Sequence, residues 1–556
     1  MYYLLLKMGG EVVFAHTADA LPLERQSLRL ENASCESCRL KVENLELRTE
    51  RGYWQGQHKR AVEREEQLKN EVAQLKARIK DLEKRLYGRK SEKKKERPTG
   101  SDAEGKEEGG KRPRGHQAGA AGHGRRSYEQ LPVVEEVYDL AQEQKRCPIC
   151  GLPYELFPGT EDSEEIEIEV KAYRRRIRRT RYTPGCQCGA AAGIISAKGP
   201  AKLIPKGRLG ISVWAMILVE KYLYQRPVYR ILESLAVYGV DISPGTVGDG
   251  LKRLAPVFEP VQKAIQEKNR QEHQWHADET RWLVFEHPEG KLNHRWYLWV
   301  FVSESTVLYL VDPRRSTKVI EEHLGGVQEG ILCVDRYSAY KCFARAHPGV
   351  VLAFCWTHQR RDFLEAAISW PELEGWAHGW VERIGDVFHL NALRVANPVG
   401  SEEFGQQDQR LREVLSQMDS KREKELGQQK MDAECRGVLQ SLKNHWEGLK
   451  VFVENPQIPM DNSEAERRMR GPAVGRKNYY GSGSIWSAHC TAWLFSIFQT
   501  LLKWDINPRQ WLCEYLSACA LNGGAAPEDL AAFLPWQMTD QQRARMVFHR
   551  CRLDSS

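Results

Sequence analysis

A regular spacing of hydrophobic residues marks the N-terminal part of the chain. Over residues 61–87 the apolar positions alternate steps of four and three residues, with Glu and Lys between them; they are Leu68, Val72, Leu75, Ile79, Leu82 and Leu86. This spacing is the seam of a left-handed coiled coil, assigned here to residues 56–88. It predicts a homo-oligomer, and the alternative is a helix that packs on its own protein. Residues 1–55 show no pattern from which a role follows.

Large apolar residues are almost absent from the next stretch, residues 89–130, which is rich in Gly, Lys, Glu and Arg. Such a composition predicts a disordered linker. Its end, KRPRGHQAGAAGHGRR, is basic and spaced by glycine. It fits either a solvated tether or a segment lying along DNA, with four side chains on phosphates or in the minor groove: Arg112, Arg114, Arg125 and Arg126.

Residues 131–205 predict a small zinc-ribbon-like domain. Cys147-Pro-Ile-Cys150-Gly supplies one pair of thiols, and Cys186-Gln-Cys188-Gly supplies a second. Four thiolates would form a closed structural Zn²⁺ site, which a domain of this size needs; the alternative is plain reduced cysteines. Between the pairs, residues 161–170 hold six acids and residues 171–182 hold seven bases. These runs fit a hairpin that pairs opposite charges, and the basic strand can also face DNA.

Helical periodicity follows in residues 206–268. A helical run ends near Gly239, and a new helix is expected to begin after Ser243-Pro244. This arrangement reads as helix-turn-helix-like. It favours recognition of DNA, and the alternative is a packing module.

The pattern then changes to strands that end in acidic residues. QWHADETRWLVF (274–285) and RWYLWVFV (295–302) are rich in aromatic and β-branched residues, and the short apolar run ILCV precedes Asp335. Asp278 lies in the first of these runs. A third acid, Glu466, lies in a short helix that opens with capping residues and is expected to stop at Gly471-Pro472.

Two strand carboxylates and one helix carboxylate form a set of hard oxygen ligands that suits Mg²⁺ or Mn²⁺. Two such ions about 4 Å apart can activate a water or a 3′-hydroxyl in phosphodiester chemistry. The chain has 75 acidic residues, and an Asp at a strand end is more often a turn former. The order of Asp278, Asp335 and Glu466, with bases around each, favours the metal site. Glu464, two residues before Glu466, leaves open which of the two faces it.

Strands that alternate with helical stretches predict an α/β multidomain protein. Residues 269–370 and 459–505 would form two parts of one catalytic core, and residues 506–556 a helical extension. The intervening residues 371–458 carry Trp and long Lys-, Glu- and Gln-rich runs, which predict a helical insertion.

Bulk composition fits a large soluble protein. The hydrophobic fraction is 41%, the mean hydropathy is −0.57 and no run of eighteen apolar residues occurs, so no membrane-spanning helix is expected. The apolar run that precedes Lys7 is too short for a signal-peptide core. The fourteen Cys are therefore expected to be reduced thiols or metal ligands in a cytoplasmic protein.

Several motifs resemble the transposases of the insertion sequence 66 family. They are HADET, CVDRYSAY, CWTHQRRDF, VERIGDVFHL and DNSEAERRMRGPAVGRKNYYGSGS, preceded by RLYGRKSEK, RPRGHQAGAAGHGR, CPICG and VEKYLYQRPVYRILESLAVYGVDISPGTV. They occur in the family's order and span about residues 60–535.

The resemblance implies an RNase H-like catalytic core of the DDE type, with Asp278, Asp335 and Glu466 as the triad. It also implies cleavage of the ends of a mobile element, joining to target DNA in the bacterial nucleoid, and small accessory proteins as partners. Basic residues in the matching motifs are candidates to hold DNA phosphates: His358, Arg360, Arg361, Arg470, Arg476 and Lys477. Tyr479 or Tyr480 could stack on an unpaired base.

Two other interpretations stay open at this point. A decayed element could act as a non-catalytic DNA-binding repressor, and a nuclease with the same core could cut without joining. Metal-dependent cleavage separates the first from a transposase, and joined products separate the second.

Overall fold

The computed structural model describes part of the chain, namely residues 43–44, 47–48, 50–66, 68–69, 132–155, 163, 165–166, 168–183, 194–286 and 295–548. Residues 50–66 are helical. Of the expected coiled-coil seam, only Leu68 is described; the rest of the seam, the linker 89–130 with its four arginines, and the thiols Cys186 and Cys188 lie outside the described residues.

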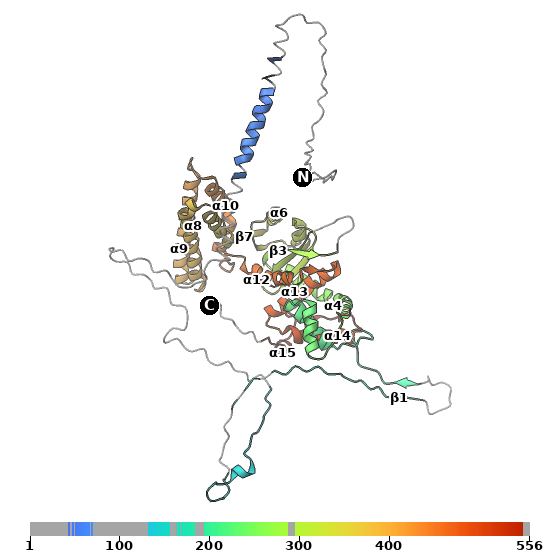
Figure 1. The fold of residues 1–556 in the computed structure, drawn as a ribbon. Helices are drawn as coiled ribbons and strands as arrows, with labels where there is room; N and C mark the ends of the chain where they lie inside the picture. Colours follow the sequence, from blue (N-terminus) through green and yellow to red (C-terminus); the bar gives the residue numbers. More distant parts are fainter. Residues whose placement is uncertain are drawn as a thin grey trace, which may run out of the picture. The chain divides into compact units, whose positions relative to one another are not determined.

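A mixed sheet lies at the centre of this region (Figure 1), with Asp278 on one of its strands and Asp335 directly after another. Its strands are β3 (Gln274–Val284), β4 (Trp296–Val302), β5 (Val307–Asp312), β6 (Gly330–Val334) and β7 (Val350–Phe354), in the order β5-β4-β3-β6-β7. β4 pairs antiparallel with both β5 and β3, whereas β3, β6 and β7 run parallel to one another. The strand runs expected at 274–285, 295–302 and 331–334 are confirmed. The short β8 (Gly481–Ser482) also pairs with β3, so β3 lies at the centre of the sheet.

Helices on the sheet complete one hydrophobic core. α4 (Pro244–Arg270) and α13 (Ile485–Lys503) pack on β5, while α5 (Thr317–Leu324) packs on α6 (Ser338–Ala346). Hydroxyls of α13 also accept hydrogen bonds from β5: Ser496 from the amide of Tyr309 at 2.7 Å, and Thr500 from that of Val307 at 3.0 Å. Strand β5 is therefore not left as an open edge, which would invite pairing with other chains.

The helical region before the sheet shares that core. It comprises α2 (Ile211–Leu218), the π-helical turn η2 (Val219–Leu223), α3 (Val228–Val237) and the start of α4. As expected, the chain breaks at Gly239, whose φ is +72°, and Ser243 caps α4 by accepting the amide of Thr246 at 3.2 Å. α4 continues from this turn along β5.

The stretch between Asp335 and Glu466 is helical after β7. It contains α7 (Trp356–Ser369), η3 (Pro371–Leu373), α8 (Glu374–Val395), α9 (Glu402–Leu426), α10 (Ala433–Leu449) and α11 (Val451–Glu454). Polar anchors hold it together: the indoles of Trp376 and Trp380 both donate to Glu425 at 3.0 Å. The buried Arg394 donates to the carbonyl of Phe452 at 2.7 Å. α10 and α11 contact β7.

The helix that carries Glu466 is longer than expected. α12 spans Ser463–Tyr479 and runs through Pro472, so the prediction that it stops at Gly471-Pro472 is wrong. A proline has no N–H to donate to the carbonyl four residues earlier, here that of Arg468. The hydroxyl of Tyr309 donates to that carbonyl at 2.8 Å instead. A partner from β5 thus satisfies the group that the proline leaves free.

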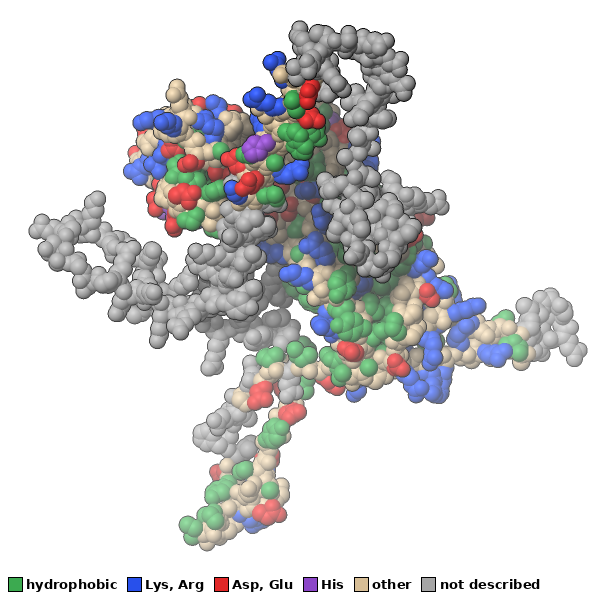
Figure 2. All heavy atoms as spheres, turned by 45° about the horizontal axis from the view of Figure 1, so that its top comes forward, with side chains coloured by type: hydrophobic (Ala, Val, Ile, Leu, Met, Phe, Trp, Pro, Cys, Tyr) green, Lys and Arg blue, Asp and Glu red, His purple; other side chains and the backbone are tan. Residues whose placement is uncertain are grey.

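The charged runs do not pair with each other in the described residues. β1 (Arg181–Tyr182) pairs antiparallel with β2 (Ile195–Ser196), and the described residues of 161–170 are not in a strand. The expected hairpin of opposite charges is therefore not seen in the described residues, and the rest of 161–170 lies outside them. A short helix, η1 (Gln142–Lys145), precedes Cys147. Val137 and Ile149 on this segment are almost fully exposed. Hydrophobic side chains are visible at the surface in Figure 2.

The C-terminal part is helical, with α14 (Pro508–Leu521), η4 (Ala531–Phe533) and α15 (Asp540–Arg545). α14 packs against α2 and α13. Among the described helices, none combines the length and the apolar character that crossing a bilayer requires.

Candidate active site

Asp278 lies on the central strand β3, half-buried. One of its carboxylate oxygens accepts the amide of Glu279 at 2.9 Å. Burial raises the pKa of Asp278 to about 7, and the negative charges of Glu279, Asp335 and Glu466 act in the same direction. Burial and nearby negative charges both disfavour the ionised form of Asp278, so a bound cation would stabilise its carboxylate.

Asp335 lies at the matching position of the neighbouring strand. β3 and β6 are parallel, with Gln274 opposite Ile331. Asp278 and Asp335 each follow their member of this pair by four residues, so the same register brings both to one end of the sheet. One oxygen of Asp335 accepts the amide of Tyr337 at 2.8 Å, which leaves the carboxylate at the strand end.

Glu466 lies near enough to Asp278 to raise its pKa, whereas Glu464 pairs with other residues. The carboxylate of Glu464 accepts hydrogen bonds from Arg468 at 2.9 Å and from Arg467 at 2.7 Å. Glu466, in the first turn of α12, raises the pKa of Asp278, and its only ion pair among the described residues is a long one, 3.8 Å, to His358. The geometry therefore favours Glu466 over Glu464 as the third carboxylate.

These three carboxylates fit a hard divalent cation by charge and donor type. No Lys, Arg or His of the described chain forms an ion pair with Asp278 or Asp335. Unpaired, mutually repelling carboxylates are what a divalent ion bound by oxygen would stabilise. The carboxylate oxygens of Asp278, Asp335 and Glu466 do not all lie within 4.8 Å of one another. Across the described residues, the set of ligand atoms within 4.8 Å of one another is that of Cys355, His358 and Glu466.

Asn462 joins β3, which carries Asp278, to α12, which carries Glu466. Its side-chain amide donates to the carbonyl of Ala277 at 2.7 Å, and its oxygen lies 3.2 Å from Nδ1 of His276. Its backbone N–H points at the sulfur of Cys355 at 3.3 Å, and its carbonyl accepts the amide of Glu466 at 3.2 Å. This residue was not among the sequence candidates, although it sits in the DNSEAE motif. His276, two residues before Asp278 on β3, is thus a hydrogen-bond partner of Asn462.

Two further buried charges surround the site and were missed from sequence. Glu279 accepts hydrogen bonds from Tyr340 at 2.6 Å and from Arg315 at 2.7 Å. Arg336 follows Asp335 and donates to Asp362 at 2.8 Å, which ties the end of β6 to α7. In the sequence, Glu279 is marked only by following Asp278. The partner of Arg336, Asp362, is marked only by following the basic pair Arg360-Arg361.

The basic candidates divide into free and committed side chains. Four are exposed: Arg360, Arg361, Arg470 and Lys477. Arg476 instead donates to the hydroxyl of Thr280 at 3.0 Å and to the carbonyl of Arg281 at 2.8 Å, so it fastens α12 to β3.

The two tyrosines also differ. The hydroxyl of Tyr479 donates to Gln225 at 2.7 Å, and its ring packs edge-on against Trp282. Tyr480 is 67% exposed with φ +66°, which makes it the tyrosine available for stacking. The next residue, Gly481, has no room for a side chain, because a Cβ there would lie 2.1 Å from the carbonyl of Leu283.

Cys147 and Cys150 form a tight turn of the kind found at thiolate metal sites. The amide of Gly151, with φ +74°, donates to the carbonyl of Cys147 at 2.9 Å. Backbone N–H groups of Cys150 and Ile149, which point at the sulfur, lower the pKa of Cys147. A lower pKa favours the thiolate, which is the form that binds metal ions.

Comparison with known proteins places the chain in a family. Residues 206–490, just over half of the chain, match the family described as "Transposase IS66 family". The chain is also 26% identical to the uncharacterized protein y4jD of Sinorhizobium fredii (strain NBRC 101917 / NGR234), over 74% of this chain and 82% of that protein. It is 25% identical to the uncharacterized protein y4qI of the same organism, over 72% of this chain and 76% of that protein. The chain is a member of the IS66 transposase family.

Proposed function

We propose that this chain is a DDE transposase that cuts the ends of its mobile element and joins the 3′ ends to target DNA. The observation that carries the proposal is the shared register of Asp278 and Asp335 at one end of parallel strands β3 and β6, with Glu466 close enough to raise the pKa of Asp278. Three antiparallel strands continued by two parallel ones support an RNase H-like core for this site.

The protein's own residues would act mainly by position. Asp278, Asp335 and Glu466 would hold Mg²⁺ or Mn²⁺, and the bound ions would supply activation of the attacking oxygen and stabilisation of the leaving one. Asn462 would set the position of β3, with Asp278, relative to the start of α12, with Glu466. Glu279 is held by Arg315 and Tyr340, so its charge stays fixed behind Asp278 without reaching into the site.

DNA would lie over the exposed bases beside the site. Arg360 and Arg361 lie in α7, shortly after His358, which pairs with Glu466 of α12, and Arg470 lies one turn beyond Glu466. Lys477 and Tyr480 continue this surface, and phosphate contacts from such side chains position a duplex without reading its sequence. Arg476 contributes indirectly by holding α12 on β3.

The N-terminal segments would assist this reaction. The proposed zinc-ribbon-like domain, with Zn²⁺ on Cys147, Cys150, Cys186 and Cys188, the helix-turn-helix-like region and the basic linker would bind element ends. The coiled coil would pair two chains, since two ends must be brought together, and accessory proteins encoded by the element would assist.

The test is incubation of the purified chain with labelled DNA that carries the terminal repeat of its own element, with and without Mg²⁺ or Mn²⁺. We expect metal-dependent nicks at the repeat boundary and joined products, both lost in Asp278→Asn and Asp335→Asn while DNA binding is kept. Glu329→Gln, an exposed acid that leads into β6, is the matched control and should keep both activities.

Other outcomes assign the chain differently. Nicks without joined products would make it a nuclease. Specific binding without nicks, even with accessory proteins added, would make it a DNA-binding repressor. Nicks that survive in Asp278→Asn would place the active site elsewhere.

A further inference from the structure

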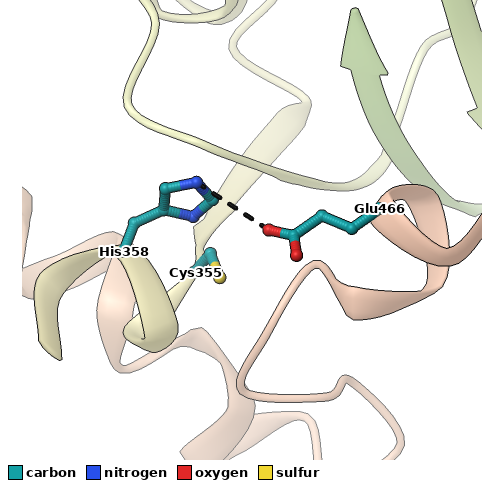
Figure 3. A group of neighbouring side chains, drawn as sticks. All are labelled: Cys355, His358 and Glu466. Carbon is teal, nitrogen blue, oxygen red and sulfur yellow. Dashed lines mark ion pairs between the residues drawn. The ribbon is translucent and has the colours of Figure 1, made fainter. Parts of the chain in front are cut away.

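Cys355, His358 and Glu466 bring three different metal-binding groups together. The thiol sulfur, a ring nitrogen and a carboxylate oxygen all lie within 4.8 Å of one another (Figure 3). Cys355 directly follows β7, His358 lies in the first turn of α7 and Glu466 lies in the first turn of α12. Two of the groups are thus fixed at the start of one helix, and the third comes from a second helix.

The sulfur of Cys355 is buried and surrounded by backbone N–H groups. Its side chain is only 2% exposed, and the N–H of Asn462 points at the sulfur from 3.3 Å. Burial raises the pKa of this thiol, and the backbone N–H groups of Asn462, His358 and Thr357, which donate to the sulfur, act in the opposite direction. N–H groups directed at a sulfur stabilise the negative charge that a metal-bound thiolate carries.

The imidazole of His358 lacks the partners that a structural histidine normally has. Its Nδ1 is buried without any hydrogen-bond partner, and its Nε2 lies 3.8 Å from Glu466, which is too long for a hydrogen bond. A buried ring nitrogen without a partner is uncommon, because leaving it unpaired costs about 1–3 kcal/mol. A bound cation at this point would supply the missing partner.

The donor set indicates which cation. Mg²⁺ prefers oxygen ligands, whereas a thiolate, an imidazole and a carboxylate together suit Zn²⁺. Three protein ligands also leave a fourth, open position, as in zinc sites that bind water or substrate.

We propose that Cys355, His358 and Glu466 form a binding site for a thiophilic divalent cation of the Zn²⁺ class. The site is separate from the four-cysteine site proposed around Cys147 and is not the Mg²⁺ site of Asp278 and Asp335, although Glu466 belongs to both. A cation held by Cys355 and His358 would draw Glu466 away from the two aspartates. Zn²⁺ would then inhibit DNA cleavage, a consequence that rests on the proposed function.

The test uses Co²⁺ as a coloured substitute for Zn²⁺, added to the full chain without DNA or Mg²⁺. Thiolate ligation of Co²⁺ gives a sulfur-to-cobalt charge-transfer band in the near ultraviolet. Since Cys147 and Cys150 would also bind Co²⁺, the titration is carried out in a Cys150→Ser chain as well as in the wild type. We expect this chain to keep one Co²⁺ equivalent with a sulfur band.

Removing Cys355 should abolish that equivalent. Cys355→Ser in the Cys150→Ser chain should lose the sulfur band, whereas Cys435→Ser, a buried thiol in α10, should keep it. His358→Gln and Glu466→Gln leave the thiol in place and should weaken Co²⁺ binding about 10- to 100-fold. These two variants decide the matter if Cys355→Ser fails to fold.

A Cys150→Ser chain that shows no sulfur band, or a band that survives both Cys355→Ser and His358→Gln, overturns the proposal. Co²⁺ binding does not depend on catalysis. A chain that binds Co²⁺ here but never cuts DNA would therefore uphold this site and count against the proposed function alone.

Discussion

The side-chain amide of Asn462 donates a 2.7 Å hydrogen bond to the carbonyl of Ala277, the residue before Asp278. Because the carbonyl of Asn462 also accepts the amide of Glu466, one buried residue sets the distance between β3 and the start of α12. Hydrogen bonds of Asn462 thus link the elements that carry two of the three proposed metal ligands, Asp278 and Glu466.

Replacing Asn462 should damage catalysis more than DNA binding. Asn462→Ala leaves the Ala277 carbonyl and Nδ1 of His276 without partners, which should cost about 1–3 kcal/mol of stability. A misplacement of about 1 Å at the site should lower the cleavage rate about 100-fold. Single-turnover cleavage and DNA-binding affinity, measured on the same preparation, check this. Equal losses in both would show that Asn462 serves folding only.

The two glutamates of the first turn of α12 form a matched pair for mutagenesis. Glu466→Gln should lower metal-dependent cleavage more than about 100-fold, because it removes a proposed ligand. Glu464→Gln should leave cleavage within a few-fold and cost about 1 kcal/mol, since the ion pairs that it loses, to Arg467, Arg468 and Lys503, are partly exposed. The reverse pattern in cleavage assays would assign Glu464 to the metal.

Tyr309 and Pro472 should be energetically coupled. Tyr309→Phe removes the hydroxyl that donates to the carbonyl of Arg468, and we expect a loss of about 1 kcal/mol. Pro472→Ala restores a backbone N–H that can bond the same carbonyl, so Tyr309→Phe should cost less in that background. A double-mutant cycle from denaturant unfolding measures the coupling. Additive effects would mean that the hydroxyl does not substitute for the missing N–H.

His323 should make the fold sensitive to acid. Burial lowers the pKa of His323 from 6.5 to about 3, and Nε2 contacts the side-chain oxygen of Asn269 at 2.8 Å. Below about pH 6.5 the unfolded chain binds a proton that the folded chain does not, so this contribution is present above that pH and is lost as the pH falls toward about 3.

The expected slope from this one group is about 1.4 kcal/mol per pH unit between about pH 6 and pH 4. His323→Gln cannot take up the proton and should have a flatter dependence over that range, which urea unfolding at several pH values would show. A slope unchanged by the substitution would assign the acid sensitivity to other groups.

Local pattern predicted the elements that local chemistry governs. The aromatic and β-branched runs predicted β3, β4 and β6, and Ser243-Pro244 predicted the start of α4, because strand-forming and capping residues act on their neighbours in sequence. The order of three acids with the family motifs was enough to propose the site. The register that aligns Asp278 with Asp335 could only be seen in the folded sheet.

Features that depend on distant partners were missed or mistaken. The end of α12 was misplaced because Tyr309, which accommodates Pro472, lies 159 residues before Arg468. Asn462 went unnoticed because its partner Ala277 is 185 residues away. Arg476 was expected on DNA, although its partners on β3 are as remote. The identity of one residue in the sequence does not show which distant residue it will contact in the fold.

The helical stretch between β7 and α12 leaves and re-enters the core at one point. The amide of Trp356 donates to the carbonyl of Met460 at 2.9 Å, so about a hundred residues close a loop whose ends touch. The cost of closing a loop grows only slowly with its length. The helical stretch between β7 and α12 can therefore change in length, or be exchanged between related mobile elements, while the sheet and its acidic residues stay in place. We expect this stretch to be the part of the molecule that varies most in evolution.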